Sequence, residues 1–233
     1  MERKTPLYQT HVDAGGKIVE FGGFLMPVQY PTGVLAEHMA VRQKAGLFDV
    51  SHMGELRLKG PDAAANVQKL ITADISAMQD GDIKYAMFCN DAGGILDDFI
   101  VYRCAADDYW LVVNAGNRDK DAAWVESHLF GNVDYRDEGN DWGQVALQGP
   151  RSGDVLKKLC AEQYIPAKYY TFIDNVPLDL GSRTIHALVS QTGYTGEYGF
   201  EIYCRAEDTV DLWHALLAAG EEFGLIPCGL GAR

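Results

Sequence analysis

The stretch LRLKGPDAAANVQKLI, residues 56–71, sets the organisation of the chain because it occurs a second time in a related form. The second form is VALQGPRSGDVLKKLC, residues 145–160. Each reads as a short alternating strand, then Gly-Pro, then a helix, and proline suits the first turn of a helix because its missing N–H would be unpaired there anyway. With an offset of 89 positions (149 − 60), Gly60 matches Gly149, Pro61 matches Pro150, and Leu70 matches Leu159.

The same offset relates two longer segments further along the chain. DDYWLVVNAGNRDKDAAWVESHL (107–129) matches GEYGFEIYCRAEDTVDLWHALLA (196–218). Both halves then read as strand, helix, strands, strand, helix, and such a repeat predicts two similar α+β domains. The matched pairs are Tyr109 with Tyr198, Val113 with Ile202, and Trp124 with Trp213.

The N-terminal part lies outside this repeat. It is rich in Gly and Pro, with short strand-like runs such as KIVEFGG. VLAEHMAVRQKAGLFDVS (34–51) then predicts a helix that ends at Gly46, since glycine is a common helix stop. The predicted buried face carries Val34, His38, Val41 and Ala45.

Composition excludes several classes of function. The net charge of −13 over 233 residues argues against a nucleic-acid or anionic-membrane partner. No apolar run reaches the roughly 18 residues of a membrane span, and the N-terminus has no signal-peptide core. The five cysteines are widely spaced without a C-x-x-C pair, so we expect free thiols in a cytoplasmic protein.

Two adjacent carboxylates, Asp97 and Asp98, interrupt the apolar strand in FCNDAGGILDDFIVYR (88–103). Successive strand residues point to opposite faces, so the two side chains cannot share one solvated edge. Because a buried, unpaired carboxylate is unstable, at least one of them requires a backbone N–H, a cation or a ligand.

QTGYTGEYGFEIY (191–203) predicts a hairpin with a tight Gly-Tyr-Thr-Gly turn. Phe200 and Ile202 face one way, so Glu201 faces the other. By spacing alone, an ordinary turn with a solvated Glu201 is the simpler interpretation. Asp49 and His52 have no diagnostic spacing for a metal, and we expect none.

The motifs HVDAGGKIVEFGGFLMPVQY, GLFDVSHMGE, NDAGGILDDFIVYR, QTGYTGEYGFEI and PCGLGAR occur in this order along the chain. Together they closely resemble the aminomethyltransferase family of the glycine cleavage system, the T-proteins. The resemblance spans the whole chain. It implies that family members continue well beyond Gly-Leu-Gly-Ala-Arg, so the sequence reads as a fragment.

The resemblance implies a three-domain cloverleaf fold with folate in a central channel. The first domain would take residues 1–54 and 142–230, the second would take 55–141 and continue past Arg233, and a β-rich third domain would be absent. The implied reaction takes an aminomethyl group from the lipoyl arm of the H-protein, releases ammonia and gives methylenetetrahydrofolate. Tetrahydrofolate would be the acceptor. The decarboxylase and lipoamide dehydrogenase components would be the other partners.

The resemblance also assigns site residues. The family's essential acid matches Asp98, which would orient the attacking amine or accept its proton, or stabilise a developing cation in a low-dielectric strand. Asp97 is expected to be structural, capped by backbone or by an arginine. The pterin-binding glutamate matches Glu201, which would accept two hydrogen bonds from a 2-aminopyrimidinone edge. Further folate-channel positions match Met53, Tyr85, Asn114, Tyr194 and Arg233.

Two alternatives stay open at this point. The first is a related folate-dependent demethylase acting on dimethylglycine, sarcosine or dimethylsulfoniopropionate, although the SHMGE and YTGEYGFE stretches favour the T-protein. The second is a non-catalytic folate-binding protein of iron–sulfur assembly. Those proteins usually carry a K-G-C-Y-x-G-Q-E type motif, whereas QTGYTGEYGFE has no such cysteine.

Overall fold

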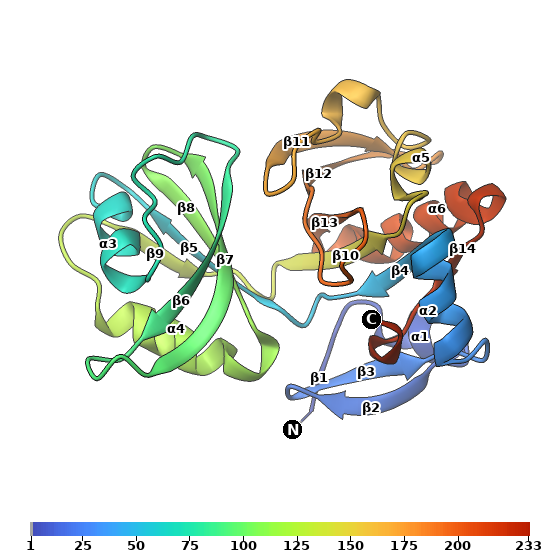
Figure 1. Ribbon diagram of the computed structural model, residues 1–233, viewed down its shortest axis with the longest axis horizontal. Helices are drawn as coiled ribbons and strands as arrows, with labels where there is room; N and C mark the ends of the chain where they lie inside the picture. Colours follow the sequence, from blue (N-terminus) through green and yellow to red (C-terminus); the bar gives the residue numbers. More distant parts are fainter. Residues whose placement is uncertain (1) are drawn as a thin grey trace. The chain divides into compact units, whose positions relative to one another are not determined.

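The computed structural model describes residues 2–233. The chain forms two compact units. The first unit combines the segment that ends at His52 with Trp142–Arg233, and the second unit is Met53–Asp141. Both contain sheets and helices, which confirms the α+β class (Figure 1). The predicted domain bounds, 1–54 with 142–230 and 55–141, remain a prediction.

The predicted repeat is present as the same order of elements in both units. Each unit runs strand, helix, two paired strands, strand, helix, and the sheets have matching orders, β6-β7-β8-β5 and β11-β12-β13-β10. In the second unit these are β5 (Gly54–Lys59), α3 (Ala63–Leu70), β6 (Ile83–Cys89), β7 (Ile95–Ala105), β8 (Asp108–Val113) and α4 (Arg118–Ser127), with β9 (Asp134–Asp137) at the sheet edge. In the first unit they are β10 (Trp142–Gln148), α5 (Ser152–Leu156), β11 (Phe172–Asp179), β12 (Thr184–Ser190), β13 (Gly199–Arg205) and α6 (Thr209–Gly220).

The Gly-Pro turn between strand and helix requires its glycine in both units. Gly60 and Gly149 have φ angles of 128° and 123°, which other residues rarely adopt. A Cβ at Gly149 would also lie 2.7 Å from the carbonyl oxygen of Lys44, and one at Gly60 would lie 2.9 Å from that of Asn132. The shared Gly-Pro dipeptide therefore forms the same strand-to-helix turn in both units.

The first unit adds elements at both ends of its chain. β4 and β14 extend the repeat sheet to six strands, in the order β11-β12-β13-β10-β4-β14. A separate three-stranded sheet has the order β1-β3-β2. These elements are β1 (Arg3–Lys4), α1 (Tyr8–Asp13), β2 (Lys17–Phe21), β3 (Phe24–Gln29), α2 (Val34–Gln43), β4 (Ala45–Asp49) and β14 (Leu225–Pro227).

The helix predicted to run from Val34 to a stop at Gly46 is confirmed at its start and is too long at its end. Helix α2 ends at Gln43, and the chain continues as strand β4 from Ala45. Gly46 is therefore not a helix stop but a strand residue, and a Cβ there would lie 2.5 Å from Val41 and 2.7 Å from the sulfur of Cys228. Of the predicted buried residues, Val41 and Ala45 are buried, whereas Val34 is half-buried and His38 is exposed. Within α2 the other buried residues are Glu37 and Ala40.

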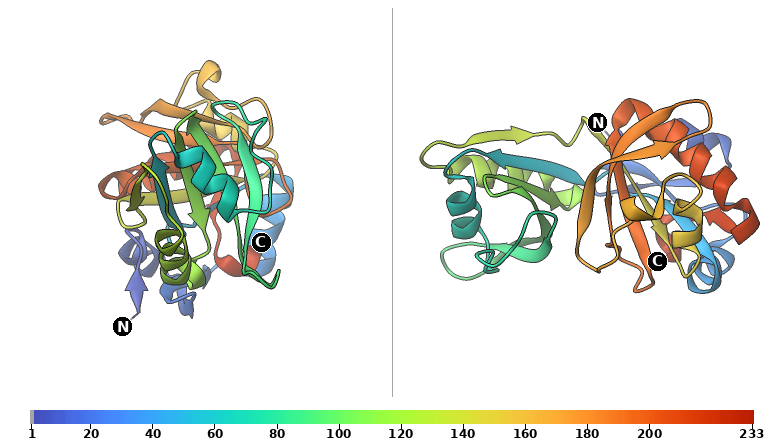
Figure 2. Two further views of the ribbon diagram at one scale, coloured as in Figure 1. Left: turned by 90° about the vertical axis from the view of Figure 1, so that its left-hand side faces the viewer. Right: turned by 90° about the horizontal axis from the view of Figure 1, so that it is seen from above.

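The six-stranded sheet of the first unit has two different faces. One face is apolar and packs against α5 and α6. Figure 2 shows the ribbon of the chain from two further sides. The other face carries Glu201, as the hairpin pattern predicted, because Phe200 and Ile202 both belong to the apolar core. In the row of paired residues across this second face, Glu201 lies between Ser190 and Ala146.

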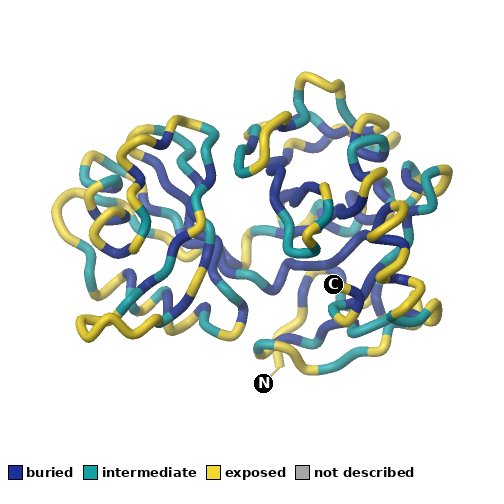
Figure 3. Tube along the Cα trace, in the orientation of Figure 1, coloured by how far each residue is buried: buried dark blue, intermediate teal, exposed yellow. Residues whose placement is uncertain are grey.

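The second unit buries one face of its sheet beneath α3 and α4. Its core includes Leu56, Phe88, Phe99, Val101 and Val125. The inner strands β4, β10 and β13 of the first unit and β8 of the second are buried almost throughout, whereas β1, β2 and β9 are largely exposed (Figure 3). All five cysteines are free, as predicted. Within residues 2–233, no helix is long and apolar enough to cross a membrane.

Candidate functional site

The two aspartates of β7 point to opposite faces, as strand geometry predicts. Asp97 is buried on the side of α4 and accepts hydrogen bonds from the backbone N–H of Asn114 (3.3 Å), from the Asn114 amide (3.0 Å) and from the Asn117 amide (2.7 Å). The prediction that one aspartate requires a partner is confirmed for Asp97. Its contacts are backbone and asparagine donors rather than an arginine.

A second buried carboxylate, Asp121 on α4, adjoins Asp97. Burial and the hydrogen bond and charge of Asp97 raise the pKa of Asp121 to about 8, with Lys120 acting in the opposite sense. Burial raises the pKa of Asp97 too, but hydrogen bonds from Asp121, Asn114 and Asn117 outweigh it and the net direction is downward. The two carboxylates therefore share a proton as a coupled pair, in which the pKa of Asp121 lies well above that of an isolated aspartate.

Asp98 lies on the other face of the sheet and is exposed. The Tyr85 hydroxyl donates to its Oδ2 at 2.8 Å, and the Asn114 amide donates to its main-chain oxygen at 2.7 Å. Three of the predicted site residues are thus brought together. Met53 comes directly before Gly54, whose strand partner is Val113, so it lies at the same end of the sheet as Asn114.

The low-dielectric setting expected for Asp98 is wrong in this structure. The sequence argument assumed that a carboxylate between apolar strand residues is buried. Strand alternation puts Asp97 into the buried side, whereas Asp98 faces solvent beside Tyr85.

Glu201 belongs to a buried polar cluster on the second face of the six-stranded sheet. The Gln144 amide donates to its Oε1 at 3.1 Å, and the Thr192 hydroxyl donates to its Oε2. Burial raises the pKa of Glu201, and these two donors oppose that rise without cancelling it. Glu201 is therefore not the solvated side chain of the simpler interpretation.

Two further predicted residues lie in the same unit as Glu201. The Tyr194 ring contacts the Phe48 ring with centroids 5.5 Å apart, and the Arg233 guanidinium lies 5.2 Å from the centre of the Tyr194 ring. The Tyr194 hydroxyl is buried with no hydrogen-bond partner among residues 2–233. Burial and the charge of Glu201 raise the pKa of Tyr194, while Arg233 lowers it. Tyr194 thus adds an aromatic surface and an unpaired donor near Glu201.

Sequence reasoning missed Gln144 and Thr192. Gln144 lies in WGQVALQ, where a polar residue on the inner strand β10 was the available signal. Thr192 directly precedes the Gly-Tyr-Thr-Gly turn, and nothing in its local pattern distinguishes it from other turn residues.

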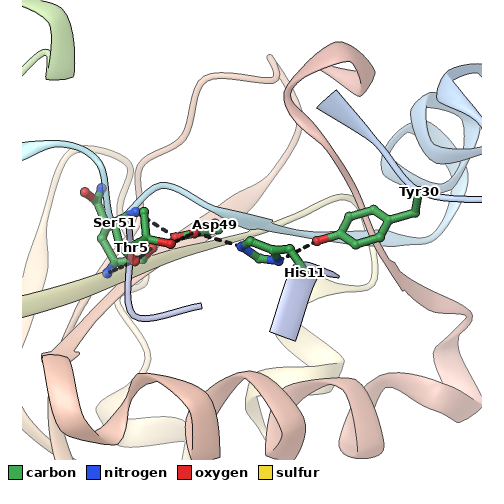
Figure 4. A network of polar contacts seen from close by, with 6 residues as sticks. Thr5, His11, Tyr30, Asp49 and Ser51 are labelled. Carbon is green, nitrogen blue, oxygen red and sulfur yellow. Dashed lines mark hydrogen bonds and ion pairs between the residues drawn. The ribbon is translucent and has the colours of Figure 1, made fainter. Parts of the chain in front are cut away.

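A second polar network of the first unit was also missed. His11 of α1 lies between the Asp49 carboxylate (2.9 Å) and the Tyr30 hydroxyl (2.8 Å), and the Thr5 hydroxyl donates to Asp49 at 2.7 Å (Figure 4). The Ser51 backbone N–H also donates to Asp49 at 2.9 Å. These bonds attach the N-terminal segment to β4. The same bonds occupy the carboxylate of Asp49, which together with His52 was the possible metal-binding pair in the sequence.

The comparisons with known proteins decide the family. The GCVT N-terminal domain family matches residues 7–233. The chain belongs to this family. Curated members of similar sequence are the aminomethyltransferase of Anoxybacillus flavithermus, 47% identical over 233 residues, and that of Halalkalibacterium halodurans, 46% identical over 231 residues. The chain spans 63% and 62% of their lengths, and they cover 100% and 99% of it.

Solved structures extend the relationship of this GCVT-family chain. The glycine cleavage system aminomethyltransferase T from Bartonella henselae superposes with a TM-score of 0.88 at 33% identity, over 100% of this chain and 61% of that one. A heterotetrameric sarcosine oxidase from Corynebacterium sp. U-96 superposes with a TM-score of 0.56 at 19% identity, over 82% of this chain and 92% of that one. The second likeness shows a shared fold only.

Proposed function

We propose that this chain carries the folate-binding and catalytic groups of a glycine cleavage system aminomethyltransferase. The protein would transfer the methylene carbon of an aminomethyl group on the lipoyl arm of the H-protein to tetrahydrofolate, with release of ammonia. Support comes from its relatives at 46–47% identity and from the Bartonella henselae structure. The observation that carries the proposal is the buried carboxylate of Glu201, which is held by two uncharged donors, Gln144 and Thr192.

Glu201 would accept hydrogen bonds from the pterin ring. Each of its oxygens takes one donor from the protein, and a carboxylate offers about four lone-pair sites. Two acceptor positions therefore remain for the N3–H and 2-amino group of a pterin ring. Tyr194 would contribute its ring surface and Arg233 its charge near the same ligand.

Asp98 is the proposed catalytic residue. Its carboxylate is exposed, and within residues 2–233 a hydrogen bond reaches one of its oxygens, Oδ2, from the Tyr85 hydroxyl. The other oxygen can orient the attacking amine of tetrahydrofolate or take its proton, and the charge would stabilise the cation that forms as ammonia leaves. Tyr85 and Asn114 would fix the side chain and the backbone of Asp98 respectively, with Met53 beside them.

The remaining parts of the proposal concern the cellular setting. Tetrahydrofolate would act as acceptor co-substrate, and the lipoylated H-protein would deliver the one-carbon unit in the cytoplasm. No donor set for a metal is required by this chemistry. The sarcosine oxidase likeness supports the same fold without favouring a demethylase.

Titration calorimetry of tetrahydrofolate against the protein and its Glu201→Gln variant tests the proposal. We expect binding by the parent that weakens by about tenfold or more in the variant, which corresponds to about 1.4 kcal/mol. Absence of binding by the parent protein would overturn the proposed function. Equal binding by both proteins would remove Glu201 from the site.

A further inference from the structure

The strongest unexplained feature is the set of neutral donors around Glu201. Thr192 is linked to Ser190 by a hydrogen bond of 2.7 Å between their hydroxyls, and its own hydroxyl donates to Glu201. Gln144 divides its amide hydrogens between Glu201 (3.1 Å) and the Tyr203 hydroxyl (2.9 Å). All of these residues are buried. The carboxylate is therefore held at both oxygens by side chains that are themselves fixed.

Glu201 has no direct cationic partner. No ion pair to its carboxylate occurs in the described part of the chain. The titratable groups around it are phenols: Tyr203 shares the Gln144 amide with Glu201, and Tyr170 and Tyr194 interact with its charge. Arg233 lies against the Tyr194 ring. Because burial disfavours the ionised form, Thr192 and Gln144 are what oppose protonation of Glu201.

Gln144 provides a second indication that the cluster is built for an occupant. Its Oε1 is buried and accepts no hydrogen bond within residues 2–233. Turning the amide over would lose the two bonds that its nitrogen makes, so the orientation is determined by Glu201 and Tyr203. An unpaired buried acceptor is destabilising, and a ligand N–H would satisfy it.

We propose that Thr192 and Gln144 are positioning residues that keep Glu201 ionised and oriented for a heterocycle with adjacent N–H donors, such as the 2-amino-4-oxopyrimidine ring of a pterin. This inference rests on the proposed function and deepens it. Thr192 sets the position of Oε2 and Gln144 that of Oε1. The remaining lone pairs of the carboxylate and the Oε1 of Gln144 then form a set of acceptors that matches contiguous donors.

The test compares tetrahydrofolate binding by the parent, Thr192→Val and Thr192→Ser as a function of pH. Thr192→Val keeps the shape but removes the donor, so we expect affinity to fall by about tenfold at neutral pH. Because Glu201 then protonates more readily, the loss of binding on acidification should begin at higher pH than in the parent. Thr192→Ser restores the hydroxyl and should restore both affinity and profile.

Thr209→Val is the matched control, because Thr209 is a buried threonine of the same unit whose hydroxyl donates to main-chain oxygens of Arg205 and Ala206. It should leave the affinity and the pH profile unchanged. Gln144→Leu is the second variant and should act in the same direction as Thr192→Val. Parent-like affinity and pH profile in Thr192→Val and Gln144→Leu would overturn the inference. Absence of binding by the parent would instead overturn the proposed function.

Discussion

At the scale of single residues, the adjacent aspartates of β7 have different surroundings. Asp97 accepts three hydrogen bonds from Asn114 and Asn117 and lies beside Asp121, whereas Asp98 accepts one from Tyr85 and faces solvent. Asn114 joins the two, because its amide bonds both Asp97 and the main chain of Asp98. The buried acid thus fixes the strand on which the exposed acid lies.

Asp98→Asn should reduce methylene transfer by at least about 100-fold, because an amide can neither take the proton nor stabilise the cation. Stability should change by less than about 0.5 kcal/mol, since the side chain is exposed. Formation of methylenetetrahydrofolate with lipoylated H-protein gives the first quantity and thermal denaturation gives the second. Asp91→Asn, an exposed acid in the turn before β7, serves as control and should keep full activity. Near-normal transfer by Asp98→Asn would refute the assignment.

Asp121→Asn should stabilise the protein at alkaline pH. The folded pKa of Asp121 is about 8, well above that of an unfolded aspartate. Its contribution to stability is therefore complete below pH ~4 and is lost as pH rises towards 8, because only the unfolded chain gives up the proton. Asparagine resembles the protonated acid and cannot ionise, so the variant does not lose this stability as pH rises. Its free energy of unfolding at pH 8 should therefore exceed that of the parent by about 1–3 kcal/mol.

Urea unfolding of the parent and Asp121→Asn at acidic and alkaline pH measures this effect. Glu126→Gln, on the exposed side of the same helix, should leave the pH dependence of stability as it is in the parent. A variant that is less stable than the parent at pH 8, with an unchanged pH dependence, would show that Asp97 and Asp121 do not share a proton.

At the scale of elements, sequence periodicity correctly predicted the features that depend on neighbouring residues alone. The repeated strand-Gly-Pro-helix segments and the alternation that turns Glu201 away from Phe200 follow from neighbouring residues alone. The change from helix α2 to strand β4 depends on distant residues instead. Gly46 looks like a helix stop in sequence, but its role is set by Val41 and by Cys228, which lies far along the chain.

The candidate site shows the same division. Glu201 and Asp98 could be selected by their motifs, whereas Gln144 reaches Glu201 only because β10 pairs with β13. The same holds for the network in which Thr5 and His11 bond Asp49, which lies 44 and 38 positions further along the chain. Contacts made by sheet pairing or by packing of distant segments carry no local signal in a single sequence.

The attachment of α1 to β4 should depend on pH. Burial raises the pKa of Asp49, but the hydrogen bonds and charge of His11 together with the bonds from Ser51 bring its net direction downward. Such a group contributes stability above its unfolded pKa and loses it as pH falls through the folded value. Asp49→Asn should therefore cost about 2–4 kcal/mol at neutral pH and lose less stability than the parent on acidification. Urea unfolding at several pH values measures both; parallel pH curves for the two proteins would contradict this account.

At the scale of the whole molecule, the second unit is inserted into the first. β4 and β10 are neighbours in one antiparallel pair, with Asp49 opposite Val145, yet residues 53–141 separate them in sequence. The apolar core on the helix-covered face of the six-stranded sheet is formed by residues of the first unit. The core of the second unit is formed by residues within 56–135. Each unit thus contains its own sheet and its own core.

A chain from which residues 53–141 are removed, with His52 joined to Trp142 by a short glycine-rich linker, should therefore fold. The backbone N–H of Val50 already bonds the carbonyl of Gln144 at 3.0 Å, so the new connection is a hairpin loop between strands that are paired in the parent. Shortening the connection also lowers the entropy lost in closing it. We expect a monomer with native-like circular dichroism and one cooperative thermal transition. An expanded chain without a cooperative transition would mean that the sheet of the first unit requires the inserted residues in order to form.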